Sequence, residues 1–244
     1  MTPLQALAHA PAPRAFTAEF DVLGDLRQRH EAVAFPVIAF DQDVWDFGNV
    51  PGVRSGLLPS QLRVQWNLIA NPVWQLACKE IAAAMLNPEH PCVAALPERR
   101  STPLPLGSLF PRSCQWRAWL AFLDDAGISN LAEVRDEHFN RYLAEGRRRL
   151  KPSSLEGSII GPVRDFSDYG PVLNQTYPPT VRPWGWTTAY QLSGQQRRKT
   201  NSSPWIPDEV FEPLVTGALF HVDVAADDII AARSRGFQTL ESNH

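Results

Sequence analysis

The sequence predicts a mainly α-helical protein, built as a small helical bundle with a helical extension before it and a helical stub after it. Residues 113–169 contain three stretches in which apolar residues recur at the spacing of one helix face. Residues 170–207 contain six prolines and little periodicity, which indicates a linker. Hydrophobic residues make up 44% of the 244 residues, enough to build a buried core.

Two regions precede the bundle. Residues 1–15 are rich in Ala and Pro and lack a basic leader, so we expect a disordered arm and not a signal peptide. Residues 16–100 form an N-terminal extension, in which residues 39–47 are either a short strand or an ordered loop. A helix is predicted from Asn71-Pro72 to Asn87-Pro88, because Pro is favoured at the first helical position. Its apolar stripe is expected to face the core and consists of Trp74, Cys78, Ile81 and Met85.

The bundle itself is assigned to residues 101–169. Its first helix carries Trp116, Leu120 and Leu123 on one face, Trp119 widens that face, and Gly127 is placed to end the helix. We expect this face to point into the core.

The second helix is predicted to begin at Asp136, whose carboxylate can cap free backbone N–H groups. Its apolar face contains Phe139, Leu143 and Leu150. Its last turn holds Arg147, Arg148 and Arg149, where the helix dipole favours positive charge. Arg141 precedes Arg148 by seven residues and therefore shares its outward face.

The third helix is predicted to begin at Ser153, after Pro152. Its buried side contains Leu155, Ile159, Val163 and Phe166, and its opposite side contains Ser153, Gly157 and Arg164. Gly157 costs about 1 kcal/mol relative to alanine, and Pro162 removes a backbone donor. Either a phosphate backbone approaches the small residues closely, or the fold tolerates a weak helix here.

The order of these motifs resembles a known family. The pattern W-x-x-W-L-x-x-L-x-x-x-G-I, then L-x-x-V-x-x-E-x-x-x-x-Y-L, a basic run, P-S-S-L and V-R-x-F is similar to the core-binding domain of tyrosine recombinases, the phage-integrase family. The resemblance implies that residues 101–169 are a helical DNA-binding domain that clasps one face of DNA. It also implies that residues 170–207 are a basic, Pro-rich linker, in which Trp184 and Trp186 pin the tether to one half of a clamp.

The same resemblance extends to WIPDEVFEPLV, which looks like the entry into the recombinase catalytic domain. Residues 208–244 are therefore expected to be a truncated start of that domain, with helices from Asp208 and from about Val222 to Arg233. The family's catalytic tyrosine, arginines, lysine and histidines lie on that domain. The resemblance thus implies DNA binding without catalysis by this chain alone.

The charge distribution supports a local DNA contact. The net charge is −3, yet residues 97–200 carry 15 basic and 10 acidic side chains. The predicted DNA-contacting residues are Arg141, Arg147, Arg148, Arg149, Lys151, Ser153, Ser154, Arg164, Arg197, Arg198 and Lys199. Alternatively, the arginines at the end of the second helix only cap and solvate that helix, and the excess of positive charge belongs to an ordinary solvated surface. The competing function is a helical protein-interaction module without DNA binding.

Other chemistry has little support in the sequence. His138, Arg141 and Tyr177 match a bare recombinase pattern, but the first two fall on a bundle helix and two prolines follow the tyrosine. Cys78, His90 and Cys92 lack a fourth metal ligand, and three cysteines do not suggest a disulfide framework. We expect no metal, no cofactor, no membrane span and a cytoplasmic location. Double-stranded DNA is the expected partner, with self-association on DNA as a further possibility.

Overall fold

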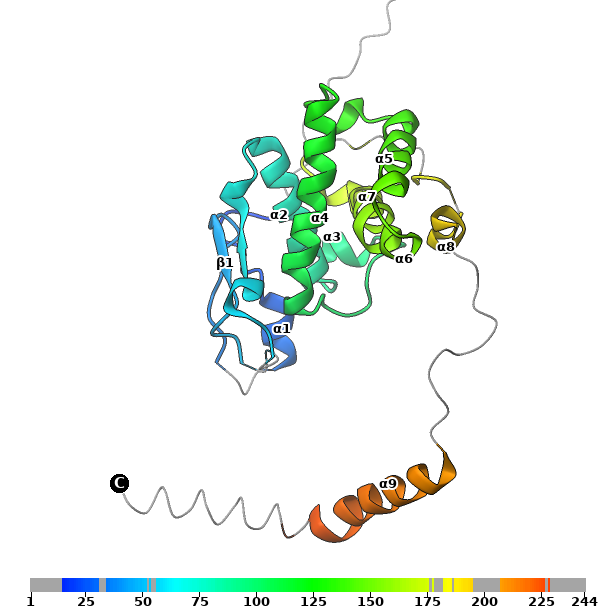
Figure 1. Cartoon of the computed structure of the whole chain (residues 1–244). Coiled ribbons are helices and arrows are strands. Elements are labelled where there is room, and N and C mark those ends of the chain that lie inside the picture. Colours follow the sequence, from blue (N-terminus) through cyan, green and yellow to red (C-terminus); the bar gives the residue numbers. More distant parts are fainter. Residues whose placement is uncertain are drawn as a thin grey trace, which may run out of the picture. The chain divides into compact units, whose positions relative to one another are not determined.

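The structure is a computed structural model that describes residues 15–30, 34–51, 53, 56–175, 177, 182–185, 187–194, 207–226 and 228. It is mainly helical, with one two-stranded sheet in the described part, which confirms the predicted fold class (Figure 1). The chain divides into two compact units, residues 1–195 and 196–244, and each is described by itself. Arg197, Arg198 and Lys199 lie outside the described residues.

The N-terminal extension begins with α1 (Gly24–Arg29) and a small antiparallel hairpin. Strand β1 (Val44–Asp46) pairs with β2 (Arg63–Gln65), with Trp45 opposite Val64. Short 3-10 turns flank β2 at η1 (Pro59–Leu62) and η2 (Trp66–Leu68). The rings of Trp45 and Trp66 meet edge to face at 4.9 Å and are fully buried. Of the two alternatives for residues 39–47, the short strand is therefore the one observed.

Helix α2 (Pro72–Leu86) follows the predicted bounds. The Asn71 side chain accepts a hydrogen bond from the Val73 N–H at 3.0 Å and so caps the first turn. Beyond α2, the Asn87 amide accepts from the Asp25 N–H and donates to the Val22 carbonyl, both at 3.0 Å. These bonds tie α2 to α1. Helix α3 (Pro91–Ala94) completes the extension.

Helix α4 (Leu106–Asp125) is the longest described helix and lies between the extension and the later helices in Figure 1. Its predicted core residues Trp116, Trp119, Leu120 and Leu123 are all buried. As predicted, it ends at Gly127, which has a φ of +77°. The Gly127 N–H donates to the Asp124 carbonyl and the Ile128 N–H to the Leu123 carbonyl, both at 2.9 Å, the two bonds of a Schellman cap.

Helix α5 (Asp136–Arg149) follows the short 3-10 turn η3 (Leu131–Glu133). Its N-terminal cap differs from the prediction, because Asp136 is the first helical residue and makes no side-chain cap. The ring Nδ1 of His138 instead accepts from the Arg135 N–H at 2.9 Å. This bond satisfies a donor that the helix start would otherwise leave free.

The third bundle helix is continuous but irregular. It runs through α6 (Pro152–Leu155), a π-helical turn η4 (Glu156–Ile160) and α7 (Gly161–Asp168). Its predicted buried residues Leu155, Ile159, Val163 and Phe166 are all in the core. The π turn precedes Pro162, which lacks the N–H that an α-helix needs, and the Gly161 N–H reaches back to the Glu156 carbonyl.

The segment after α7 differs from a free linker. It contains the 3-10 turn η5 (Gly170–Val172) and α8 (Ala189–Ser193), and both belong to the first compact unit. The Thr188 hydroxyl caps α8 by accepting from the Gln191 N–H at 3.2 Å, and Leu192 is buried. Residues 182–185 and 187–194 therefore include packed structure, although the prolines of this region indicate a linker.

The second unit contains α9 (Asp208–Phe220) and the π turn η6 (His221–Ala225). Helix α9 starts where the sequence predicts, and none of its residues is buried. Its exposed apolar side chains include Val210, Phe211 and Leu214. None of the helices that the structure describes combines the length and the apolar character needed to cross a membrane.

Candidate nucleic-acid interface

The predicted basic surface forms where α5 ends and α6 begins. Arg147, Arg148 and Arg149 occupy the last turn of α5, and Lys151 precedes the first residue of α6. All four residues are exposed. Helix α5 packs closely against η4 beside this connection: a Cβ on Gly146 would lie 2.7 Å from Cγ1 of Ile159.

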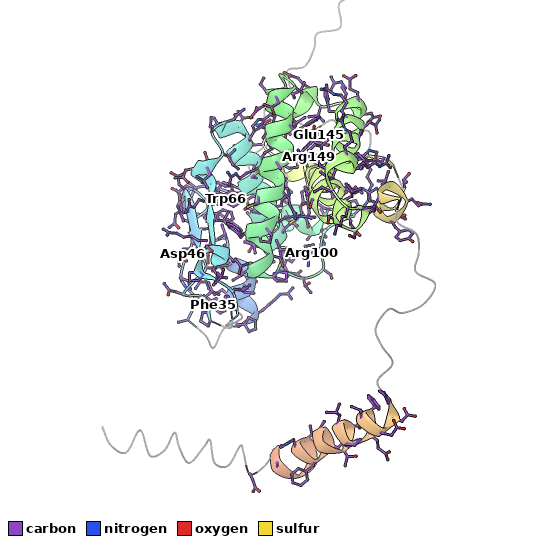
Figure 2. All side chains as sticks on the ribbon, viewed as in Figure 1. Phe35, Asp46, Trp66, Arg100, Glu145 and Arg149 are labelled. Carbon is purple, nitrogen blue, oxygen red and sulfur yellow. The ribbon has the colours of Figure 1, made fainter. Side chains whose placement is uncertain are left out.

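Two of these cations are free to meet a ligand. Arg148 and Lys151 are exposed, and their side chains make no hydrogen bond or ion pair with the described residues. Arg149 instead pairs with Glu145 one turn earlier, Nη1 to Oε1 at 2.9 Å, in an exposed contact (Figure 2). Such a pair is worth well under 1 kcal/mol, so a phosphate can replace Glu145 at little cost.

Ser153 and Ser154 lie beside these cations, in the first turn of α6. Both are exposed, and the Ser154 N–H donates to the Lys151 carbonyl at 2.9 Å. The helix that starts here continues through η4 and α7, so its dipole is that of a long helix. Hydroxyls and a helix start beside two free cations favour an anion such as phosphate.

Arg141 lies further back on α5. It is exposed, and its guanidinium carbon is 5.8 Å from the centre of the Phe122 ring on α4. This contact places Arg141 over the junction of α4 and α5. The prediction that Arg141 and Arg148 share an outward face is consistent with the exposure of both.

Arg147 is engaged within the protein. Its Nε and Nη2 donate to the Leu192 carbonyl at 3.2 and 2.6 Å, at the C-terminal end of α8. Two of its donors are therefore occupied, although the residue as a whole is exposed.

Arg164 is half-buried and does not continue the exposed surface of Ser153 and Gly157. Its Nη2 donates to the Thr187 carbonyl, and its guanidinium carbon is 6.0 Å from the Trp184 ring. Burial, reinforced by Arg182, lowers the pKa of Arg164. The reason for its position is the π turn, which takes up about one extra residue and rotates later positions by about 100° relative to a regular helix.

The backbone carbonyls of Thr187 and Leu192, the partners of these arginines, could not be predicted from the sequence. Trp184 was expected to anchor the tether, and it contacts α5: its ring lies 6.0 Å from Phe139, and its Nε1 donates to Asn140 Oδ1 at 3.2 Å. Trp186 lies outside the described residues. The signal for α8 was the pair Thr188 and Gln191, a capping box that marks a helix start.

Two residues of the bare recombinase pattern, His138 and Tyr177, have structural roles. His138 caps α5, and Tyr177 is buried, with a hydroxyl that has no hydrogen-bond partner among the described residues. Burial raises the pKa of Tyr177 above its usual range. A phenol in this state is neutral and is not presented to a phosphodiester in solution.

A second pair of cations lines a groove of about 450 Å³ between α4 and the hairpin. Arg63 and Arg117 lie there with Cys114 and Asp46, and Arg63 faces Asp46 at 3.6 Å. No group of His, Cys, Asp or Glu within the described ranges could hold a metal ion. In the groove Asp46 offsets one of the two cations, whereas the side chains of Arg148 and Lys151 face no acidic partner among the described residues.

Comparison with known proteins identifies no relative: no protein family, no curated protein and no solved structure matches the chain.

Proposed function

We propose that this chain binds double-stranded DNA through phosphate contacts at the α5–α6 surface, defined as Arg148, Arg149, Lys151, Ser153 and Ser154. The observation that carries the proposal is the pair Arg148 and Lys151, exposed and unpaired among the described residues, beside two serines at a helix start. Cations on a helix end and free hydroxyls are the groups that position proteins on a DNA backbone.

The wider role follows from the sequence resemblance. The chain is proposed to act in the cytoplasm as the N-terminal, DNA-binding part of a tyrosine-recombinase-like integrase, without cleaving DNA by itself. Self-association on DNA is part of the same proposal. The burial of the Tyr177 hydroxyl supports the proposal that this tyrosine does not act as a nucleophile on DNA.

Salt dependence tests the proposal. Duplex affinity is measured at several salt concentrations for the wild type, Arg148→Ala and Lys151→Ala. Loss of one phosphate contact should lower the magnitude of the slope of log K against log salt by about 0.9, for any duplex sequence. Arg29→Ala is the matched control, because it removes one exposed arginine from α1, where it pairs with Glu89.

Unchanged affinity and slope for both folded variants would reject the α5–α6 surface as the DNA site. A protein-interaction role is the second candidate, and the exposed apolar residues of α9 favour it. That role alone predicts no salt-dependent binding of duplex DNA by the wild type.

A further inference from the structure

The segment 182–194 is held on the bundle by two of the predicted DNA-contacting arginines. Within this strap, defined as residues 182–185 and 187–194, the carbonyls of Thr187 and Leu192 accept from Arg164 and Arg147. Both arginines come from the bundle, one from α7 and one from α5. The strap therefore occupies two arginines that the sequence predicts as DNA contacts, and one of them, Arg147, directly precedes Arg148 of the α5–α6 surface.

One aromatic residue anchors the strap at its first turn. The Trp184 ring lies 6.0 Å from the Phe139 ring on α5 and 6.0 Å from the Arg164 guanidinium carbon on α7. Its Nε1 donates a hydrogen bond to Asn140 Oδ1 on α5. Removal of this ring would take away contacts with both α5 and α7 at once.

The docked strap also carries internal costs. Trp184 has a φ of +61°, which a residue with a side chain rarely adopts. The Nε of Arg164 and the hydroxyl of Tyr190 are buried without a hydrogen-bond partner among the described residues. Each of these features destabilises the docked arrangement and makes its release easier.

We infer that the strap and the DNA backbone compete for Arg147 and Arg164, so that the strap holds the protein in a state of lower DNA affinity. The inference rests on the proposed function and adds a regulation of that DNA binding. A docked strap occupies two donors of Arg147 and covers Arg164 with Trp184. Release of the strap would free both guanidinium groups from their carbonyl partners and leave them available to a DNA backbone.

The competition is tested with Trp184→Ala, which removes the anchor. Two added phosphate contacts should raise the magnitude of the salt slope by about 1.8 and tighten duplex binding roughly tenfold at low salt. Asn140→Ala removes only the hydrogen bond to the Trp184 ring, leaves the core intact, and should change both quantities in the same direction. Asn174→Ala is the matched control, because this exposed asparagine bonds through its backbone N–H.

A combined variant separates competition from a general effect of the substitution. In a protein that already carries Arg147→Ala and Arg164→Ala, Trp184→Ala should leave affinity and slope unchanged. Hydrogen exchange gives an independent readout: duplex DNA added to the wild type should speed exchange in residues 182–194 and slow it in residues 147–155.

The outcomes distinguish the two proposals. Salt-dependent binding by the wild type, with unchanged or weaker binding by both Trp184→Ala and Asn140→Ala, overturns the competition and leaves the DNA site standing. Absence of salt-dependent binding in the wild type and in every variant overturns both.

Discussion

The carboxylate of Asp165 in α7 forms a bidentate ion pair with the guanidinium of Arg112 in α4. Nη2 of Arg112 lies 2.7 Å from Oδ1, Nε reaches Oδ2, and the Trp116 Nε1 donates to Oδ2 at 2.7 Å. Asp165 is buried. We expect Arg112→Ala to lower the free energy of unfolding by about 3 kcal/mol, because it leaves a buried carboxylate without its counter-ion. Urea unfolding measures this, with the exposed Arg149→Ala as a control that should cost under 1 kcal/mol.

The same carboxylate predicts a pH dependence. Burial raises the pKa of Asp165 to about 6, against the opposing effect of Arg112 and the two side-chain hydrogen bonds. The unfolded chain releases this proton near pH 4, so between about pH 4 and 6 the folded state binds more protons. The free energy of unfolding should therefore fall by about 2–3 kcal/mol for this group as the pH rises through that window.

Urea titrations of the wild type and Asp165→Asn at pH 4.5, 5.5 and 7 isolate this contribution. The wild type should lose its stability advantage, or increase its deficit, relative to the variant as the pH rises. A difference that is constant or grows in favour of the wild type would contradict the raised pKa.

Two glycines of the third helix should respond in opposite ways to alanine. A Cβ on Gly157 meets no atom within 4 Å, so Gly157→Ala should stabilise the protein by about 0.5–1 kcal/mol through better helix propensity. A Cβ on Gly161 would lie 2.9 Å from Arg112 Nη1 and 3.1 Å from the Glu156 carbonyl, so Gly161→Ala should cost about 1–3 kcal/mol. Thermal unfolding of both variants checks the sign, and equal shifts would be inconsistent with this packing.

The contact between Gly146 and Ile159 should appear as a coupling energy. Gly146→Ala places a Cβ 2.7 Å from Ile159 Cγ1 and should cost about 1–3 kcal/mol. Ile159→Ala removes the obstructing atoms but leaves a cavity. In a double-mutant cycle the two losses should sum to more than the loss in the double variant. Simple additivity would show that α5 moves away at no cost.

The three cysteines should differ in reactivity. Cys78 is fully buried, and burial raises the pKa of its thiol, whereas Cys92 and Cys114 are exposed. A thiol-specific chromogenic reagent should label two thiols in the native protein and the third only on unfolding, because the thiolate is the reactive form. Labelling of all three at one rate in the native state would contradict the burial of Cys78.

The helices could be predicted because each carries its own periodic apolar face. Leu155, Ile159, Val163 and Phe166 identify the core side of the third helix from local spacing alone, and the structure confirms it. Helix α4 begins at Leu106, and Leu106 and Leu109 are already buried, a start that the spacing of Trp116, Leu120 and Leu123 does not locate.

The candidate site was predictable in part. Local composition located the basic end of α5. It did not show which of these cations already have a partner within the protein. The partners of Arg147 and Arg164 are backbone carbonyls, which carry no residue signature in a sequence. The conformation of Trp184 opposes its local preference and depends on Phe139 and Asn140, more than 40 residues earlier.

Helix α4 connects the N-terminal extension to the bundle within the first compact unit. On one side its Asp124 accepts from Trp74 Nε1 of α2 at 2.6 Å, and on the other its Arg112 holds Asp165. Just before it, the Leu104 N–H donates to the Met85 carbonyl at 2.9 Å. A fragment of residues 101–169 alone would keep the Arg112–Asp165 pair but lose the bonds of Asp124 and Leu104 to the extension. Helix α4 therefore couples the stability of the bundle to that of the extension.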